Sequence, residues 1–359
     1  MKAHTHNIYE KLDAANRALE RDPAYPAIPM PATMRELIAR YEYGMKERLY
    51  EIVNAYTSRR AAASRPRYVH DVGQVDILPP LMPGKMLNAA VNFYSHVGET
   101  GTPEEQKKAA EERKAKRGVP YLFLKPTEGA IVGDGDDVVI PYGRDRVDWE
   151  VELGIVIGRA AKYVPATEAP NHIFGYMVTV DVSDRGGRPP GGFGSGSDWL
   201  VGKGHDTFAP TGPWIVPKEF YGDPMKRLRQ TLTVDGKVMQ EAGAADMIHS
   251  IYELIEYASS IITLFPGDVV NNGTSGGVGM GTAVRGEQRF LKPGETIEAT
   301  IDDIGTQRIP VKGEEAPSEG TGARLPPVRE LGAALRRRAC GVGILRLGAP
   351  RSGALISPP

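Results

Sequence analysis

The 359-residue sequence is poor in cysteine, in long apolar runs and in excess charge of either sign. Its single cysteine, Cys340, excludes an internal disulfide framework. No uninterrupted apolar stretch approaches the roughly 18 to 20 residues of a membrane-spanning helix, and segment 1–22 lacks the apolar centre of a secretory signal. A formal net charge of −1 leaves no basic field for nucleic acid or an anionic membrane. The sequence therefore predicts a cytoplasmic protein that binds neither nucleic acid nor membrane.

The chain does contain enough apolar residues, 41% of the total, to bury a large core. Residues 8–60 place apolar side chains at helical spacing among charges, which predicts a helical N-terminal extension over 1–75. The charge-rich segment 102–118 predicts an exposed helix or a mobile segment. After about residue 313 the sequence contains arginine but no lysine and is rich in Gly, Pro and Ala, which predicts a disordered tail over 313–359.

Between these parts, residues 76–312 are predicted to form one domain. From about residue 121 to residue 311, short β-branched runs alternate with Gly, Pro and Asp. One segment of helical spacing, 246–264, interrupts them. Because strands and helices do not alternate regularly, the pattern favours a β-rich α+β domain over a doubly wound sheet.

The segment "DWEVELG", 148–154, carries acidic residues on every second position of a predicted strand. Side chains alternate along a strand, so Glu150 and Glu152 point the same way and opposite to Val151. A solvated charged face is one explanation. The other is a metal site, because Asp181 ends the apolar run "IFGYMVTV" and a neighbouring strand would bring it beside both glutamates. Three converging carboxylates require a cation, and oxygen ligands suit Mg²⁺, Mn²⁺ or Ca²⁺.

Two further segments contain side chains suited to proton transfer. In "NFYSHVGE", His96 and Glu99 are three residues apart, so on one helical turn Glu99 would orient the imidazole and raise its basicity. Capping or surface positions are the alternative. In "VGKGHDTFAP", Lys203 lies between glycines that permit close approach of a ligand, unless it is an exposed loop lysine. A P-loop is excluded because Gly204 follows this lysine in place of Ser or Thr.

The glycine-rich segment 266–281 offers backbone N–H groups and the Thr274 hydroxyl, which suit a carboxylate or an enolate. Its glycines do not form the dinucleotide-binding pattern. A simple glycine-rich turn is the alternative.

Taken in order, eight segments over roughly residues 77–311 resemble the fumarylacetoacetate hydrolase superfamily. They are "NFYSHVGE", "YLFLKP", "VDWEVELGIVIG", "IFGYMVTVDVSDR", "KGHDTFAPTGPWIV", "LTVDGKVMQ", "TLFPGDVVNNGTSGGVG" and "FLKPGETIEATIDDIG". The resemblance implies a mixed β-roll core in a homodimer. The sequence departs from the family in one place, where a longer glycine-rich loop, 186–198, replaces the short connection common in relatives.

The resemblance assigns a role to each candidate residue. Glu150, Glu152 and Asp181 fall on the family's metal ligands, and Lys203 falls on its active-site lysine. The general-base dyad would be His96 and Glu99, and substrate-lining positions would be Arg185, Gln240 and Thr274.

The implied activity is a divalent-metal-dependent hydrolase that cleaves a C–C bond in an acylpyruvate-like 1,3-dicarbonyl acid, in aromatic compound catabolism. The expected cofactor is Mg²⁺, or Mn²⁺ or Ca²⁺ in its place, and the expected partner is a small 2-oxo or β-diketo acid. Decarboxylation or tautomerisation of a 2-oxo acid on the same site is the alternative. A non-catalytic member that only binds an oxo acid is the second alternative.

Overall fold

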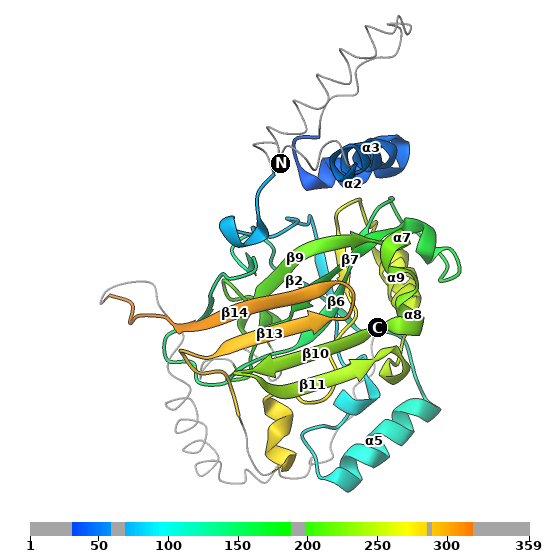
Figure 1. Ribbon diagram of the computed structural model, residues 1–359. Helices are drawn as coiled ribbons and strands as arrows, with labels where there is room; N and C mark the ends of the chain where they lie inside the picture. The colour runs from blue at the N-terminus through cyan, green and yellow to red at the C-terminus, as the bar shows by residue number, and fades with distance from the viewer. Residues whose placement is uncertain (1–30, 59–68, 188–197, 286–288, 319–359) are drawn as a thin grey trace, which may run out of the picture.

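The computed structural model describes residues 31–58, 69–187, 198–285 and 289–318. Two large sheets dominate this part of the chain, with few helices (Figure 1). The β-rich α+β fold predicted from the sequence is confirmed. The predicted helical residues 8–30 and the predicted tail from residue 319 onward lie outside the described residues, so the proposed division of the chain stays a prediction.

The larger sheet has seven strands, in the order β2-β1-β12-β6-β7-β9-β3. In that order the strands are Leu122–Lys125, Met86–Ala89, Val269–Asn271, Val151–Ile157, Ile173–Val180, Ala209–Pro217 and Ile131–Val132. The second sheet has five strands, in the order β11-β10-β13-β14-β4, which are Lys237–Gly243, Arg229–Val234, Thr296–Ile301, Gly305–Gly313 and Val138–Ile140. A third pair joins β5 (Val147–Asp148) to β8 (Ser183–Asp184).

The α-helices are short and lie around the sheets. They are α2 (Met34–Arg40), α3 (Met45–Thr57), α5 (Pro103–Ala115), α6 (Trp199–Lys203), α7 (Lys218–Tyr221), α8 (Pro224–Arg227) and α9 (Ile251–Ile261). The 3₁₀ turns are Tyr41–Tyr43, Val72–Gln74, Tyr94–His96, Ala169–His172, Ala244–Asp246 and Met280–Arg285. None of the helices within the described ranges combines the length and the hydropathy that a bilayer span requires.

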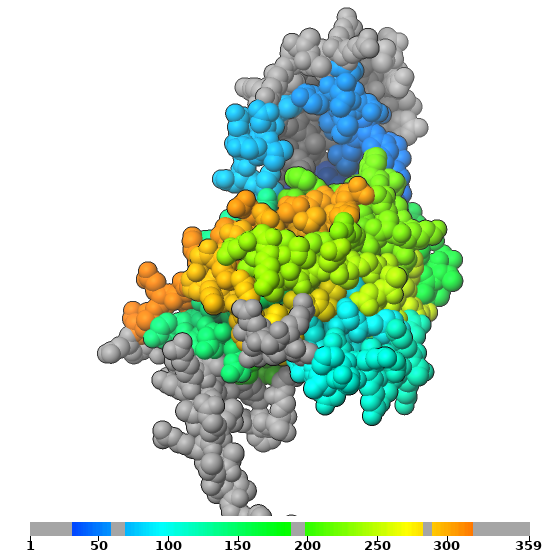
Figure 2. Space-filling view, turned by 60° about the horizontal axis from the view of Figure 1, so that its bottom comes forward, coloured from blue at the N-terminus to red at the C-terminus, as the bar shows by residue number. Residues whose placement is uncertain are grey.

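Helix α5 shows how local sequence decides structure. Thr102 and Glu105 cap each other's backbone N–H groups, and Pro103 occupies the first turn, where its missing N–H costs nothing. No residue of α5 is buried. The exposed helix predicted from the charges of 102–118 is therefore present, and it lies on the surface opposite the N-terminal helices (Figure 2).

The main core fills the space between the two large sheets. Strand β6 contributes Leu153 and Ile155 to it, and the facing sheet contributes Leu232, Ile297 and Ile309. The opposite face of the large sheet packs against α2 through a smaller apolar cluster. Because side chains alternate along β6, this second face also carries the acidic residues of "DWEVELG".

Candidate active site

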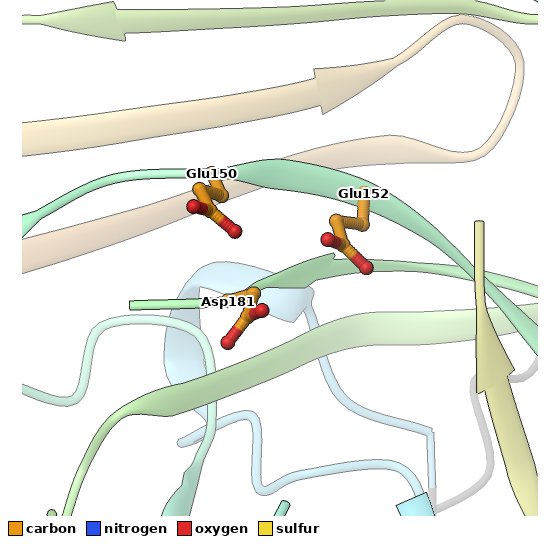
Figure 3. Close-up of side chains that lie close together, drawn as sticks. All are labelled: Glu150, Glu152 and Asp181. Atoms are coloured by element: carbon orange, nitrogen blue, oxygen red, sulfur yellow. The ribbon is translucent and has the colours of Figure 1, made fainter. Parts of the chain in front are cut away.

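Three carboxylates meet where β6 and β7 run antiparallel. The register pairs Val151 with Val180, so Glu150 and Asp181 lie opposite each other, and the Asp181 N–H donates to the Glu150 carbonyl at 2.8 Å. Glu150, Glu152 and Asp181 each offer one oxygen, and these oxygens lie within 4.8 Å of one another. Both glutamates extend from the same stretch of chain toward Asp181 (Figure 3). The structure thus brings together the three residues predicted as metal ligands.

The three carboxylates are buried and are balanced by lysines. Their residues are 5% exposed or less, which excludes the solvated charged face considered from the sequence. The Lys203 ammonium donates to Glu150 Oε2 at 2.8 Å and to Asp181 Oδ2 at 2.7 Å. A second buried ammonium, that of Lys125, donates to the other oxygen of Asp181. The two lysine ammonium groups therefore offset part of the negative charge of the three carboxylates, so protonation need not do so alone.

The environment moves the pKa values of the two glutamates in opposite directions. Burial alone would raise the pKa of Glu150, but the Lys203 and Arg185 charges outweigh it and hold that pKa well below its ordinary value. Burial and the charges of Asp181 and Glu150 raise the pKa of Glu152 well above its ordinary value. Burial lowers the pKa of Lys203, yet the two facing carboxylates outweigh it and raise the pKa overall, so the lysine stays charged.

Glu152 provides the test of whether these residues fit a divalent cation. Its Oε2 atom is buried and has no hydrogen-bond partner among the residues that the structure describes. A buried carboxylate oxygen without a donor is costly unless a proton or a cation satisfies it. Glu150 and Asp181 already accept hydrogen bonds from basic side chains. The three carboxylates together match the oxygen ligands that hard divalent ions take, so the residues present fit such an ion.

The expected base and its partner are also together. His96 Nδ1 lies 2.7 Å from Glu99 Oε2. The other Glu99 oxygen accepts the Gly277 N–H, and Gly281 packs so closely that a Cβ there would lie 2.2 Å from the Glu99 carboxyl carbon. The His96 charge helps to lower the pKa of Glu150, which places the imidazole within electrostatic reach of the acidic cluster.

Gln240 and Thr274 contact each other and the backbone of the strand that carries the glutamates. Gln240 donates to the Thr274 hydroxyl at 2.8 Å and accepts the Val151 N–H at 3.1 Å. The Thr274 hydroxyl donates to the Val151 carbonyl at 2.9 Å. Both side chains are buried and together hold the residue between Glu150 and Glu152. Their geometry supports the strand that carries the glutamates, and their contact with substrate stays a prediction.

Arg185 lies against the acidic cluster. Its Nε donates to Asp148 Oδ2 at 3.1 Å, and its Nη2 donates to Glu150 Oε1. The neighbouring Asp148 is fully buried and also accepts the Gly279 and Met280 N–H groups. Arg185 thus joins the charge balance of the site, and its substrate contact, too, stays a prediction.

The sequence reasoning missed Lys125 and Asp148 as parts of the site. Lys125 ends the apolar segment "YLFLKP", and its ammonium also donates to the Val182 carbonyl at 2.9 Å. The available signal was a charged residue at the end of a short apolar strand. For Asp148 the signal was its place in "DWEVELG", on the same alternating face as Glu150 and Glu152.

Comparison with known proteins agrees with this geometry. The family model described as fumarylacetoacetate (FAA) hydrolase C-terminal matches residues 85–312. The chain is 37% identical over 225 residues to a 2,4-didehydro-3-deoxy-L-rhamnonate hydrolase of Sphingomonas sp. (strain SKA58). The matched segment covers 63% of this chain and 72% of that protein.

Two solved structures are similar in fold. Maleylpyruvate hydrolase from Sphingobium sp. SYK-6, in complex with manganese(II) ion and pyruvate, is 26% identical with a TM-score of 0.59, over 84% of this chain and 92% of that one. A 5-carboxymethyl-2-hydroxymuconate delta-isomerase from Mycobacterium smegmatis is 33% identical with a TM-score of 0.55, over 68% and 85% of the two chains. Both hydrolases and isomerases are thus among the proteins this chain is similar to.

Proposed function

Because the chain belongs to the fumarylacetoacetate hydrolase family, we propose that it is a divalent-metal-dependent hydrolase that cleaves a C–C bond in an acylpyruvate-like 1,3-dicarbonyl acid. One observation carries this proposal. A buried acidic triad contacts a charged lysine and lies within electrostatic reach of a hydrogen-bonded His–Glu pair. These are the groups that cleavage of a β-diketone by water requires: a cation site, an oxyanion donor and a base.

Glu150, Glu152 and Asp181 would hold the divalent ion, for which we propose Mg²⁺, with Mn²⁺ or Ca²⁺ as alternatives. When bound, such an ion supplies Lewis-acid stabilisation of developing enolate charge, a contribution of several kcal/mol. The proposal of a divalent ion is supported by the manganese(II) named with the maleylpyruvate hydrolase structure.

His96 would take a proton from the attacking water. Its Nδ1 is hydrogen-bonded to Glu99, which fixes the ring and leaves Nε2 as the basic nitrogen. A positioned general base of this kind typically contributes a rate factor of about 10² to 10⁴.

Lys203 would donate a hydrogen bond to the oxyanion that forms on the attacked carbonyl. Its raised pKa keeps the ammonium charged at neutral pH. One well-placed donor to a developing oxyanion is worth about 10² to 10³ in rate.

Tautomerisation or decarboxylation of a 2-oxo acid is the second candidate, favoured by the isomerase named among the similar structures. These reactions need no water attack, and His96 or Lys203 would instead move a proton to or from the enolate carbon. A protein that only binds an oxo acid has no need of a base, and the His96–Glu99 hydrogen bond argues against that alternative.

Product analysis tests the proposal. The full chain supplied with Mg²⁺ or Mn²⁺ would be incubated with acetylpyruvate and, separately, with oxaloacetate. Formation of pyruvate and acetate from acetylpyruvate supports the hydrolase. Release of CO₂ from oxaloacetate without cleavage of acetylpyruvate would replace it with the decarboxylase. The homodimer expected from the resemblance stays a prediction, which sedimentation of the full chain tests.

A further inference from the structure

Three aromatic side chains form a cluster outside the two apolar cores of the part of the chain that the structure describes. The Phe123 and Trp199 rings are stacked, with centroids 4.5 Å apart and an interplanar angle of 29°. The Tyr121 ring lies 5.8 Å from the Trp199 ring. Trp199 remains 36% exposed, and Tyr121 is more exposed still. Large rings that stay open to solvent at the edge of a catalytic cluster are available to a ligand.

The cluster lies on the Lys203 side of the acidic site. The Lys203 ammonium nitrogen is 5.3 Å from the centroid of the Phe123 ring, and the same nitrogen contacts Glu150 and Asp181. The rings are therefore one side chain away from the three carboxylates.

Local structure fixes both rings in this place. Trp199 and Lys203 begin and end α6, and residues four apart share one face of a helix. The Asp198 carboxylate accepts the Leu200 and Val201 N–H groups and so holds the start of this helix. Phe123 is two residues from Lys125 on β2, so both side chains point to the same face of the strand.

We propose that Phe123 and Trp199, with Tyr121 at the rim, form the subsite for the acyl substituent of the substrate, and that this substituent is a flat aryl or unsaturated group. This inference rests on the proposed function, in which Lys203 donates to the oxygen of the attacked carbonyl. The substituent is bonded to that carbonyl carbon, so it lies beside the Lys203 ammonium. There it meets the rings of Phe123 and Trp199.

The chemistry of the aromatic rings predicts which acyl substituent binds more tightly. An aryl group can stack on them in an offset geometry, which favours binding by about two- to twelvefold beyond the effect of buried area. A polyhydroxylated chain would lose its hydration against the same rings, because their faces offer it no hydrogen-bond partner of comparable strength. The expected order of substituents is therefore aryl, then methyl, then polyhydroxylated chain.

The test measures binding without turnover. 2-Oxo-4-phenylbutanoate and 2-oxopentanoate carry the same 2-oxo acid. Each has a methylene group in place of the attacked carbonyl, with a phenyl or a methyl group bonded to it as the substituent, so neither can be cleaved. Titration calorimetry of the full chain with Mn²⁺ would give the ratio of their dissociation constants. We expect 2-oxo-4-phenylbutanoate to bind about tenfold more tightly, and Trp199→Leu to reduce this ratio to about threefold or less.

Trp214→Leu is the matched control, because Trp214 is 44% exposed and its indole N–H donates to the Ile304 carbonyl in the turn between β13 and β14. This variant should keep the wild-type ratio. Tyr121→Ala replaces Trp199→Leu if that variant fails to fold, and it should lower the ratio as well.

The outcomes separate the inference from the proposed function. Cleavage of acetylpyruvate together with equal binding of the two probes would overturn the inference and leave the hydrolase in place. A strong preference for 2-oxo-4-phenylbutanoate without cleavage of any acylpyruvate would support the subsite and overturn the hydrolase. If Trp199→Leu changes the oligomeric state but not the ratio, the cluster is a subunit contact and the inference is wrong.

Discussion

The ammonium nitrogen of Lys203 lies 2.7 Å from Oδ2 of Asp181. This single contact links the two halves of the proposed chemistry, because Asp181 is a proposed metal ligand and Lys203 is the proposed oxyanion donor. Lys125 holds the other oxygen of the same carboxylate. A divalent ion bound to Asp181 would weaken the attraction between this carboxylate and the Lys203 ammonium. The ammonium would then be more available to an oxygen of the substrate.

Glu150→Gln should abolish binding of a divalent ion and lower turnover by about 10³-fold or more, while the fold persists. The variant removes one of three carboxylates, and with it several kcal/mol of transition-state stabilisation by the ion. The substitution also removes the charge that pairs with Lys203 and Arg185, so the melting temperature should fall, while the amide of the same size keeps the packing. Titration calorimetry with Mn²⁺ and thermal unfolding measure the two effects.

The control for this variant is Glu241→Gln, because Glu241 is exposed and pairs only with Arg229 at the surface in the described contacts. It should leave metal binding and turnover unchanged. Retention of wild-type Mn²⁺ affinity in Glu150→Gln would contradict the assignment of the triad.

His96→Ala should lower the rate of acylpyruvate cleavage by about 10² to 10⁴ with a small change in KM, because a base acts on the water and not on substrate binding. Glu99→Gln should have a smaller effect, since the imidazole remains and loses only its anionic partner. Steady-state kinetics of both variants on acetylpyruvate check this order. Equal rates in wild type and His96→Ala would favour a reaction without water attack.

We expect the free energy of unfolding to depend on pH through the carboxyl group of Asp184. Burial would raise the pKa of Asp184, but hydrogen bonds from His205 and Arg144 outweigh it and lower the pKa below its ordinary value. A depressed carboxyl pKa contributes stability above the unfolded value of about 3.9, and this stability is lost as pH falls through the folded value. Asp184→Asn should therefore lower the free energy of unfolding by about 3 kcal/mol at pH 7, with a smaller difference below about pH 4.

Urea unfolding at pH 7, 5 and 3.5 measures this difference. Asp303→Asn is the control, because the Arg227–Asp303 pair is exposed and should contribute about 1 kcal/mol or less at any of these pH values. A difference between wild type and Asp184→Asn that does not change with pH would show that the carboxylate charge contributes nothing.

Tyr41→Phe should loosen the docking of the N-terminal helices on the domain. The Tyr41 hydroxyl is buried and donates to Glu219 Oε1 at 2.5 Å, and Tyr50 donates to the same oxygen at 2.9 Å. A hydrogen bond to a charged acceptor contributes about 1.5 to 3 kcal/mol. Unfolding measurements should show a loss of this size for Tyr41→Phe, and none for Tyr43→Phe at an exposed ring. An equal effect of both substitutions would contradict the role of Glu219.

The acidic triad could be predicted from sequence because it follows from one rule. Alternation along β6 and the residue before it puts Glu150 and Glu152 on one face, and the next long strand, β7, ends one residue before Asp181. Antiparallel pairing of consecutive strands then brings the third carboxylate opposite the first. The charges of 102–118 predicted an exposed helix or a mobile segment, and the structure shows the helix, with a cap that the prediction did not use.

The partners of the triad could not be predicted in this way. Lys125 and Asp181 are 56 residues apart, and their contact depends on how the large sheet curves. Gln240 comes from the second sheet and reaches the Val151 backbone only because the two sheets pack face to face. No spacing in the sequence encodes such contacts, so only the structure shows that these residues support β6.

The most direct test of the proposed function follows the loss of the enol absorbance of acetylpyruvate. The full chain is first freed of metal with a chelator, and the rate is measured before and after addition of Mg²⁺ or Mn²⁺. We predict no cleavage after chelation and restored cleavage to pyruvate and acetate once the ion is added, with no restoration in Glu150→Gln. Cleavage that proceeds equally well after chelation, or restoration in Glu150→Gln equal to that of wild type, would contradict a metal-dependent hydrolase built on this triad.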